Sequence, residues 1–188
     1  MLAPLVLWGL TGIIFLLKPG YEGAYQKLTP KLYTLQQTLN VASAPEWQEV
    51  RVLRTILGDH LLVNLQGQWK QLDPVTLDER DAPSESNIKA LVSDAISIDA
   101  KRYGEIESIE AGVVVTNTGV EISLDWPTMT LRQKGLDTRI IGALYKVHYL
   151  QWLGVPWLNK ILGALGIVLL LCLSALGYRA YRQSRKAT

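Results

Sequence analysis

Two stretches without any charged residue, one near each end of the chain, constrain the fold more than any other feature. They cover residues 2–17 and 161–178. At about 1.5 Å of rise per residue, helices over them would be ~24 Å and ~27 Å long, close to the roughly 30 Å of membrane hydrocarbon. We therefore expect two transmembrane helices, over residues 1–18 and 161–178. Leu17 is not followed by the small-residue cleavage site of a secretory signal, which favours a retained anchor.

The distribution of charge predicts how the chain would be oriented in a membrane. All 17 acidic residues lie between Glu22 and Asp137, whereas residues 179–188 form a basic tail without any acid. The basic residues of this tail are Arg179, Arg182, Arg185 and Lys186. Because basic residues next to a span stay in the cytoplasm, the tail is predicted to be cytoplasmic and the middle of the chain to lie on the other side of the membrane, which is the periplasm if the source is a Gram-negative bacterium. No stripe of basic and aromatic residues appears, so a nucleic-acid partner is not expected.

Aromatic residues flank the second apolar stretch in the way that they flank membrane spans. Tyr178 and Tyr181 follow it, and a cluster of amphipathic side chains precedes it within residues 143–160, which we interpret as an interfacial helix and linker. Such rings are enriched at membrane–water interfaces. The predicted interface anchors are Tyr145, His148, Tyr149, Trp152 and Trp157.

The first part of the middle region is predicted to be helical. Thr29 and Pro30 favour a helix start, with threonine as the N-cap and proline in the first turn. Leu32, Leu35 and Leu39 follow at helical spacing. We therefore expect an amphipathic helix that begins at this threonine.

Residues 50–72 predict a three-stranded antiparallel meander. Residues 50–57 are rich in β-branched side chains, and turn signals at Gly58 and Gly67 separate the strands that follow.

The following region predicts a helix and then more strands. Ser84 or Ser86 is expected to cap a helix that runs to about residue 98. The sequence Thr-Asn-Thr-Gly at 116–119 is typical of a hairpin turn between two strands, and residues 128–133 favour a further strand.

These elements define an α+β domain over residues 19–142, in which antiparallel sheets pack with helices. Helix-plus-meander units over 29–78 and 84–133 suggest a weak internal repeat. Asp137 or Thr138 is expected to start a final helix that runs toward the second apolar stretch.

Three segments share motifs with one known family. The segment LWGLTGIIFLLKPGYEGAY has an apolar helix with a Thr-Gly pair, followed by Lys-Pro. The segment GDHLLVNLQGQWKQLDPVTLDE has a strand pair closed by Asp73, Pro74 and Thr76, with Leu77 where the family pattern has glycine. The segment ALYKVHYLQWLG has a His-Tyr pair before the second apolar stretch. In this order, the segments resemble the PepSY-associated transmembrane (PepSY-TM) family.

The resemblance implies a PepSY-like periplasmic domain between two transmembrane helices. Larger relatives with more spans include haem-binding iron or siderophore reductases. This chain has only two predicted spans and lacks their further membrane histidines. It is therefore similar to small two-span members, which look like accessory subunits or assembly factors.

His148 is the one candidate for cofactor binding. A haem in a membrane commonly has two axial histidines, and the only other histidine, His60, lies in a predicted strand. We therefore interpret His148 as an interface anchor and expect no cofactor. Haem shared with a partner protein is the alternative interpretation.

The remaining motifs do not indicate an enzyme. The sequence contains no catalytic triad, metal-binding motif or phosphate-binding glycine loop. Cys172 stands alone in an apolar stretch, where cysteine behaves as a small hydrophobic residue. Neither a metal site nor a catalytic residue is expected.

Small residues in the two apolar stretches indicate helix packing. Glycine lets membrane helices approach closely, so these positions favour either packing of the two spans on each other or docking on another membrane protein. The glycines concerned are Gly9, Gly12, Gly163, Gly166 and Gly177.

The leading hypothesis is a non-enzymatic accessory, stabilising or assembly subunit of a bacterial inner-membrane complex, respiratory or metal-handling. Its expected partners are an integral membrane protein complex, the lipid bilayer and a periplasmic protein. One alternative is a haem-binding electron-transfer component of a membrane reductase. Another is a PepSY-type regulator that binds a peptidase or sensor.

Overall fold

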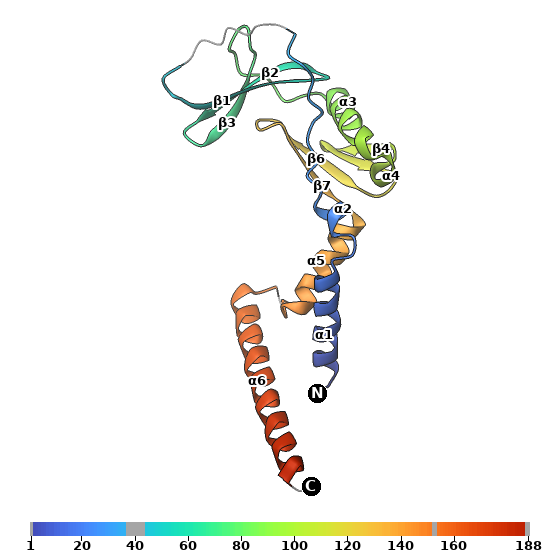
Figure 1. Ribbon diagram of the computed structural model, residues 1–188. Helices are drawn as coiled ribbons and strands as arrows, with labels where there is room; N and C mark the ends of the chain where they lie inside the picture. Colours follow the sequence, from blue (N-terminus) through green and yellow to red (C-terminus); the bar gives the residue numbers. More distant parts are fainter. Residues whose placement is uncertain (1, 37–43, 152–153, 187–188) are drawn as a thin grey trace. The chain divides into compact units, whose positions relative to one another are not determined.

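The computed structural model describes residues 2–36, 44–151 and 154–186 (Figure 1). The chain divides into two compact units. Residues 21–138 form an α+β unit, and the residues on either side of this range form a helical unit.

In its described residues, the α+β unit has seven strands in two antiparallel sheets. Its strands are β1 (Trp47–Thr55), β2 (Gly58–Leu65), β3 (Gln68–Leu72), β4 (Ile106–Glu110), β5 (Val113–Thr116), β6 (Glu121–Asp125) and β7 (Thr130–Lys134). Its helical elements are α2 (Tyr21–Tyr25), α3 (Glu85–Ile96), a 3₁₀ turn (Ser97–Asp99) and α4 (Ala100–Tyr103). Helix α5 (Leu136–His148) begins in this unit and continues into the helical one.

Each sheet is a meander in which neighbours in sequence are neighbours in space. The strand orders are β1-β2-β3 and β4-β5-β6-β7 (Figure 1). Leu62 pairs with Gln71 in the first sheet, and Val114 pairs with Ile122 in the second. The predicted α+β class, with antiparallel sheets and helices, is confirmed. The predicted three-stranded meander and the hairpin turn at 116–119 are confirmed as well.

The main core lies between helix α3 and the second sheet. One side of α3 is buried because its apolar residues recur at helical spacing. Val92 of this helix and Ile122 of strand β6 are both fully buried in one cluster with Tyr103. A second cluster joins Leu62 of the first sheet to Leu91 of α3. Full burial of one such side chain contributes about 1.5–3 kcal/mol, so both sheets depend on α3.

The predicted helix that begins at Thr29 and Pro30 is wrong. Residues 26–36 have no regular secondary structure. Instead, Leu28 is buried in the main core, and the backbone N–H of Tyr33 donates a 2.9 Å hydrogen bond to the carbonyl of Arg54. Tertiary contacts of this extended segment therefore outweigh its helical pattern.

The predicted internal repeat is not present in the described residues. Where it is described, the first predicted unit has three strands and no helix before them, whereas the second has a helix followed by four strands. Leu39, the last residue of the predicted leucine pattern, lies outside the described residues.

The helical unit contains α1 (Leu2–Leu17), the end of α5, and α6 (Pro156–Lys186). Among the described residues, α6 is the one helix long and apolar enough to cross a membrane, and none of its most apolar window is buried. The apolar part of α1, Val6–Leu17, is shorter. By length and composition, α6 could therefore cross a membrane, whereas α1 does not reach the same length.

Ser84 is the residue that caps α3. Its side chain accepts a 3.3 Å hydrogen bond from the backbone N–H of Asn87, whereas Ser86 bonds to the hydroxyl of Ser84. We expect Ser84→Ala to lower the free energy of unfolding by about 1 kcal/mol, because one helix donor loses its partner. Ser86→Ala is the control, and urea denaturation measures both. Equal losses in the two variants would contradict this assignment of the cap.

Candidate functional site

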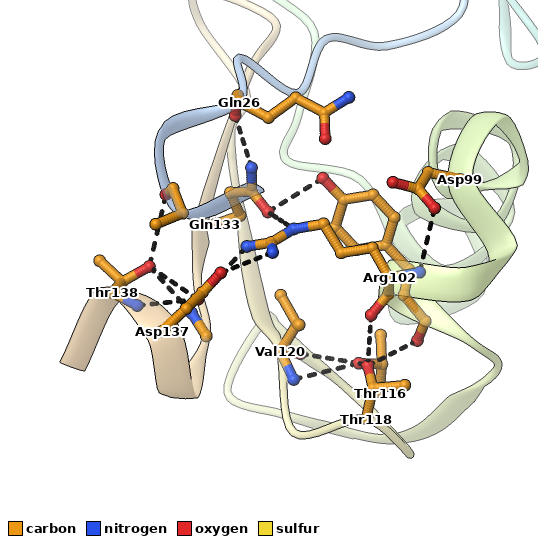
Figure 2. A network of polar contacts seen from close by, with 12 residues as sticks. Gln26, Asp99, Arg102, Thr116, Thr118, Val120, Gln133, Asp137 and Thr138 are labelled. Carbon is orange, nitrogen blue, oxygen red and sulfur yellow. Dashed lines mark hydrogen bonds and ion pairs between the residues drawn. The ribbon is translucent and has the colours of Figure 1, made fainter. Parts of the chain in front are cut away.

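A polar cluster of the α+β unit is built around Arg102 (Figure 2). Asp99 accepts a hydrogen bond from the backbone N–H of Arg102 and so caps α4. The guanidinium reaches both carboxylate oxygens of Asp137, with Nη1–Oδ2 at 2.7 Å and Nη2–Oδ1 at 3.5 Å. Its Nε donates to Oε1 of Gln133 at 3.1 Å. This fork geometry makes the pair stronger and more directional than a single ion contact.

Gln133 extends the cluster to the segment that follows α2. Its Oε1 also accepts a 2.9 Å bond from the hydroxyl of Tyr103, and its Nε2 donates to the carbonyl of Gln26 (Figure 2). Thr138 donates to the carbonyl of Ala24 at 3.4 Å. The cluster therefore joins the two ends of the α+β unit, where the chain arrives from α1 and where it leaves through α5.

Gly23 is required for this close approach. A Cβ atom at this position would lie 2.7 Å from Nη1 of Arg102 and 3.6 Å from Oδ2 of Asp137. With a side chain at position 23, the guanidinium would therefore have to shift from its present place beside the carboxylate. The glycine thus allows α2 to pass directly over the ion pair.

The cluster shifts the pKa of two of its members. Hydrogen bonding from Arg102 holds the pKa of Asp137 below its usual value. Desolvation by burial raises the pKa of Tyr103. Both groups therefore stay in the form that the hydrogen bonds require near neutral pH, with the aspartate ionised and the tyrosine protonated.

An open depression of about 340 Å³ lies beside the cluster. Its lining carries both signs of charge, from Lys101 and Arg102 and from Asp99 and Asp137. The guanidinium and the carboxylate of the innermost pair are bonded to each other. Because these charged groups are hydrogen-bonded to one another, the arrangement supports a structural role of the cluster.

We expect Asp137→Asn to lower the free energy of unfolding by about 1–2 kcal/mol at pH 7, because it removes a charged partner from a largely buried arginine. The native pKa of Asp137 is depressed, so its contribution is present above the unfolded pKa of roughly 3.9 and is lost as pH falls through the native pKa. The difference between wild type and variant should therefore shrink in acid. Urea denaturation at pH 7 and at pH 3 measures this, with the exposed Asp81→Asn as the control.

His60, a fully buried residue of β2, forms a second polar cluster with side chains of the two neighbouring strands. Gln71 donates through Nε2 to the carbonyl of Trp126, so its Oε1 faces Nδ1 of His60 at 2.9 Å and must accept. The Nε2 atom then accepts from the hydroxyl of Thr55 at 2.7 Å. These partners define a neutral imidazole with the proton on Nδ1.

Desolvation by burial lowers the pKa of His60 below its usual 6.5. Arg80, whose Nη1 lies 3.5 Å from Nδ1, adds to this effect, and Asp59 opposes it. His60 is thus a structural residue of the sheet. It is fully buried, and both of its ring nitrogens are hydrogen-bonded within the protein. Among the described residues, no cluster of three or more histidine, cysteine or acidic side chains could hold a metal ion.

We expect the stability of the α+β unit to fall as pH drops below about 6.5. His60 then binds a proton in the unfolded state but not in the native state, where its pKa is lower. The slope approaches about 1.4 kcal/mol per pH unit. Thermal unfolding between pH 8 and pH 5 should show it in wild type and in His148→Gln. In His60→Gln this part of the slope should be absent, and an unchanged slope would contradict the assignment.

His148, the cofactor candidate of the sequence, lies against helix α1. Its Nδ1 is 2.9 Å from the hydroxyl of the buried Thr11, and its carbonyl accepts a 2.8 Å bond from Nε1 of Trp8. The ring stacks on Trp8, with centroids 5.2 Å apart, and Phe15 meets it edge-on at 4.9 Å. His148 therefore joins α5 to α1 by both polar and aromatic contacts.

The other predicted interface anchors are only partly brought together. Tyr145 stacks on Phe15 at 4.6 Å and on Tyr149 at 5.8 Å. Trp157 is exposed at the start of α6. Trp152 lies outside the described residues. Tyr145 and His148 thus both contact Phe15 of α1.

The glycines of the apolar helices fall into two groups. A Cβ at Gly12 would lie 3.8 Å from His148, and one at Gly166 would lie 2.9 Å from Leu150. No described atom lies within 4 Å of the Cβ position at Gly9, Gly163 or Gly177. The first group packs within the chain, and the second faces space that lipid or a partner helix can fill.

The Asp-Pro-x-Thr motif forms a tight turn after β3. The carboxylate of Asp73 accepts bonds from the backbone N–H groups of Thr76 and Val75, which lower its pKa. Leu77 has a φ of +64°, in the region that favours glycine. The residue that departs from the family motif thus adopts the backbone conformation that a glycine would adopt more easily.

Sequence reasoning missed the Arg102–Asp137 pair and the role of Thr11. The ion pair joins residues 35 positions apart, and the threonine and His148 are 137 apart. The one available signal for Thr11 was its hydroxyl within an apolar helix, because threonine side chains in such helices often form hydrogen bonds to a neighbouring helix.

The chain matches no protein-family model, no curated protein and no solved structure. The likeness to the PepSY-TM family therefore depends on the sequence motifs.

Proposed function

We propose that this protein is a non-enzymatic subunit that stabilises, or helps to assemble, a bacterial inner-membrane complex. It would be anchored by two membrane helices, α1 and α6, and would carry a PepSY-like α+β domain in the periplasm. The observation that carries the proposal is the apolar surface of α6, none of which is covered in its most apolar window. Burial of apolar surface stabilises a protein by about 25 cal/mol per Å², so such a helix requires lipid or another membrane protein.

The contact between α1 and α5 supports a membrane position for α1 as well. Polar side chains within a membrane are costly unless they have a partner. Thr11 and His148 are partners, and Thr11 also bonds to the carbonyls of its own helix. Gly12 lies beside the same ring. Close packing over a small residue together with an interhelical hydrogen bond is typical of helix pairs in lipid.

The polar groups of the α+β unit support a binding role over a catalytic one. The ion pair of Arg102 and Asp137 and the side chain of His60 make hydrogen bonds that fix elements of the fold. The glycines with open space, Gly9, Gly163 and Gly177, offer positions at which a partner helix could approach.

A pair of glycine substitutions tests the proposal. Gly163→Leu should dissociate the chain from its complex and leave the chain itself stable, because this glycine has open space in the structure. Gly166→Leu, its matched control one turn away, should destabilise the chain, because a side chain there meets Leu150. Native gels of detergent-solubilised membranes, with mass spectrometry of the co-purified proteins, measure assembly. Isolation of the wild-type chain alone under mild conditions would contradict the proposal.

Reporter fusions test the topology that the proposal requires. A fusion after Thr188 should report the cytoplasm, and a fusion in the 79–86 segment should report the periplasm, because the basic residues after α6 favour the cytoplasmic side. A cytoplasmic signal from the 79–86 fusion would contradict two spans.

One observation favours a second candidate function, a haem-binding electron-transfer component. Nδ1 of His148 is bonded to Thr11, and no hydrogen bond to Nε2 is found among the described residues. Axial histidines are commonly held in this way through their second nitrogen. The other histidine, His60, is fully buried in a sheet, so a second ligand would have to come from a partner.

Visible spectroscopy separates the two functions. We expect no Soret band from the purified chain, because only one of the two histidines of the chain belongs to the helical unit. His148→Ala should leave the spectrum unchanged and weaken the contact with α1 by about 0.5–1.5 kcal/mol. A Soret band that His148→Ala removes, in the chain or in its complex, would instead support the electron-transfer function.

A further inference from the structure

Helix α6 continues without a break beyond its apolar part. It runs from Pro156 to Lys186, whereas the charge-free stretch ends at Tyr178. The extension is therefore helical and rises about 12 Å beyond the apolar part. Its arginines, Arg179, Arg182 and Arg185, are all exposed.

The basic residues of the extension share one side of the helix. At about 100° per residue, positions 179, 182, 185 and 186 fall within an arc of roughly 120°. The remaining residues of the extension, Ala180, Tyr181, Gln183 and Ser184, fall outside this arc. The helix thus presents a concentrated positive strip, directly after a segment that can cross a membrane.

Nothing in the described chain neutralises this strip. The last acidic residue of the sequence is Asp137, and no ion pair to Arg179, Arg182 or Arg185 occurs among the described residues. Arg185 lies over the ring of Tyr181, at 5.5 Å from its centroid. That contact orients the guanidinium without cancelling its charge.

We infer that the basic strip of α6 binds the headgroups of anionic phospholipids. This inference rests on the proposed anchoring of α6 in a membrane. The headgroup region is about 5–8 Å deep on each side of the hydrocarbon. Arg179 and Arg182 lie within that depth if Tyr178 is at its inner edge, and the long side chain of Arg185 can reach back to it. Clusters of four or more basic residues next to a span attract acidic lipid in this way.

The geometry favours lipid over an acidic protein as the occupant. The distance of each basic residue from the apolar stretch is set by one continuous helix, so insertion of that stretch brings the strip to the phosphates without any further folding. An acidic protein would have to displace the lipid headgroups that already contact the basic strip.

Relative binding of two lipids by the full chain in reconstituted bilayers tests the inference. Spin-labelled phosphatidylglycerol and phosphatidylcholine report, by electron paramagnetic resonance, the fraction of each lipid held at the protein. Wild type should prefer phosphatidylglycerol. The double variant Arg182→Gln with Arg185→Gln should lower this preference by up to about fivefold per removed charge. The control, Lys89→Gln with Lys134→Gln, removes the same charge from exposed positions of the α+β unit and should keep the preference.

Salt and extraction complete the test. The preference should weaken at 1 M salt, where the Debye length is about 3 Å. Equal association of the two lipids with wild type, or a preference that the arginine variant retains, would overturn the inference and leave an acidic protein surface as the partner. Alkaline carbonate extraction of the same membranes tests the anchoring separately. Release of the chain would contradict the proposed anchoring, whereas retention with equal lipid binding contradicts only the lipid inference.

Discussion

The ion pair between Arg102 and Asp137 is the interaction on which the α+β unit depends for its closure. A guanidinium with 14 % of its side chain exposed requires a carboxylate and further acceptors, because an unpaired charge at that depth is costly. Asp137 and Gln133 supply them from the end of the second sheet, and Gly23 leaves the space above the pair for the first segment of the unit. One electrostatic requirement thus positions a helix, a sheet and both chain connections.

The proposed membrane position would place the helical unit under a different constraint, set by an apolar solvent. In lipid, apolar side chains gain little from packing against each other, so hydrogen bonds and close backbone contacts decide which helices associate. The contact of His148 with Trp8 and Thr11 has both features, and Gly12 lies beside it. The two units therefore combine opposite solutions: apolar burial with a few charged contacts in one, and polar contacts on apolar helices in the other.

Local patterns predicted the elements whose stability is local. The strands of both meanders and the cap at Ser84 follow from turn residues, β-branched runs and a single side-chain acceptor. The segment after Pro30 failed, because its leucine spacing favours a helix, whereas Leu28 and Tyr33 are held by residues far along the chain. The Arg102 cluster was equally invisible, since an arginine and an aspartate 35 residues apart carry no mark of being neighbours. Contacts of this kind are set by the packing of the sheets, which no local pattern encodes.

The hydrogen bond from Thr138 to Ala24 joins residues 114 positions apart, and the bond from Trp8 to His148 joins residues 140 apart. The α+β unit is therefore a closed loop whose two ends are also held by the helical pair outside it. A cross-link around a loop of this size removes conformations from the unfolded chain and stabilises the folded one by up to about 5 kcal/mol. While α1 and α5 remain packed, the domain unfolds as a ring and not as a free chain. Part of the stability of the domain then comes from the lower conformational entropy of its unfolded state while the helix pair is packed. Cutting the chain between the domain and either helix would remove this part of the stability, even with every contact inside the domain intact.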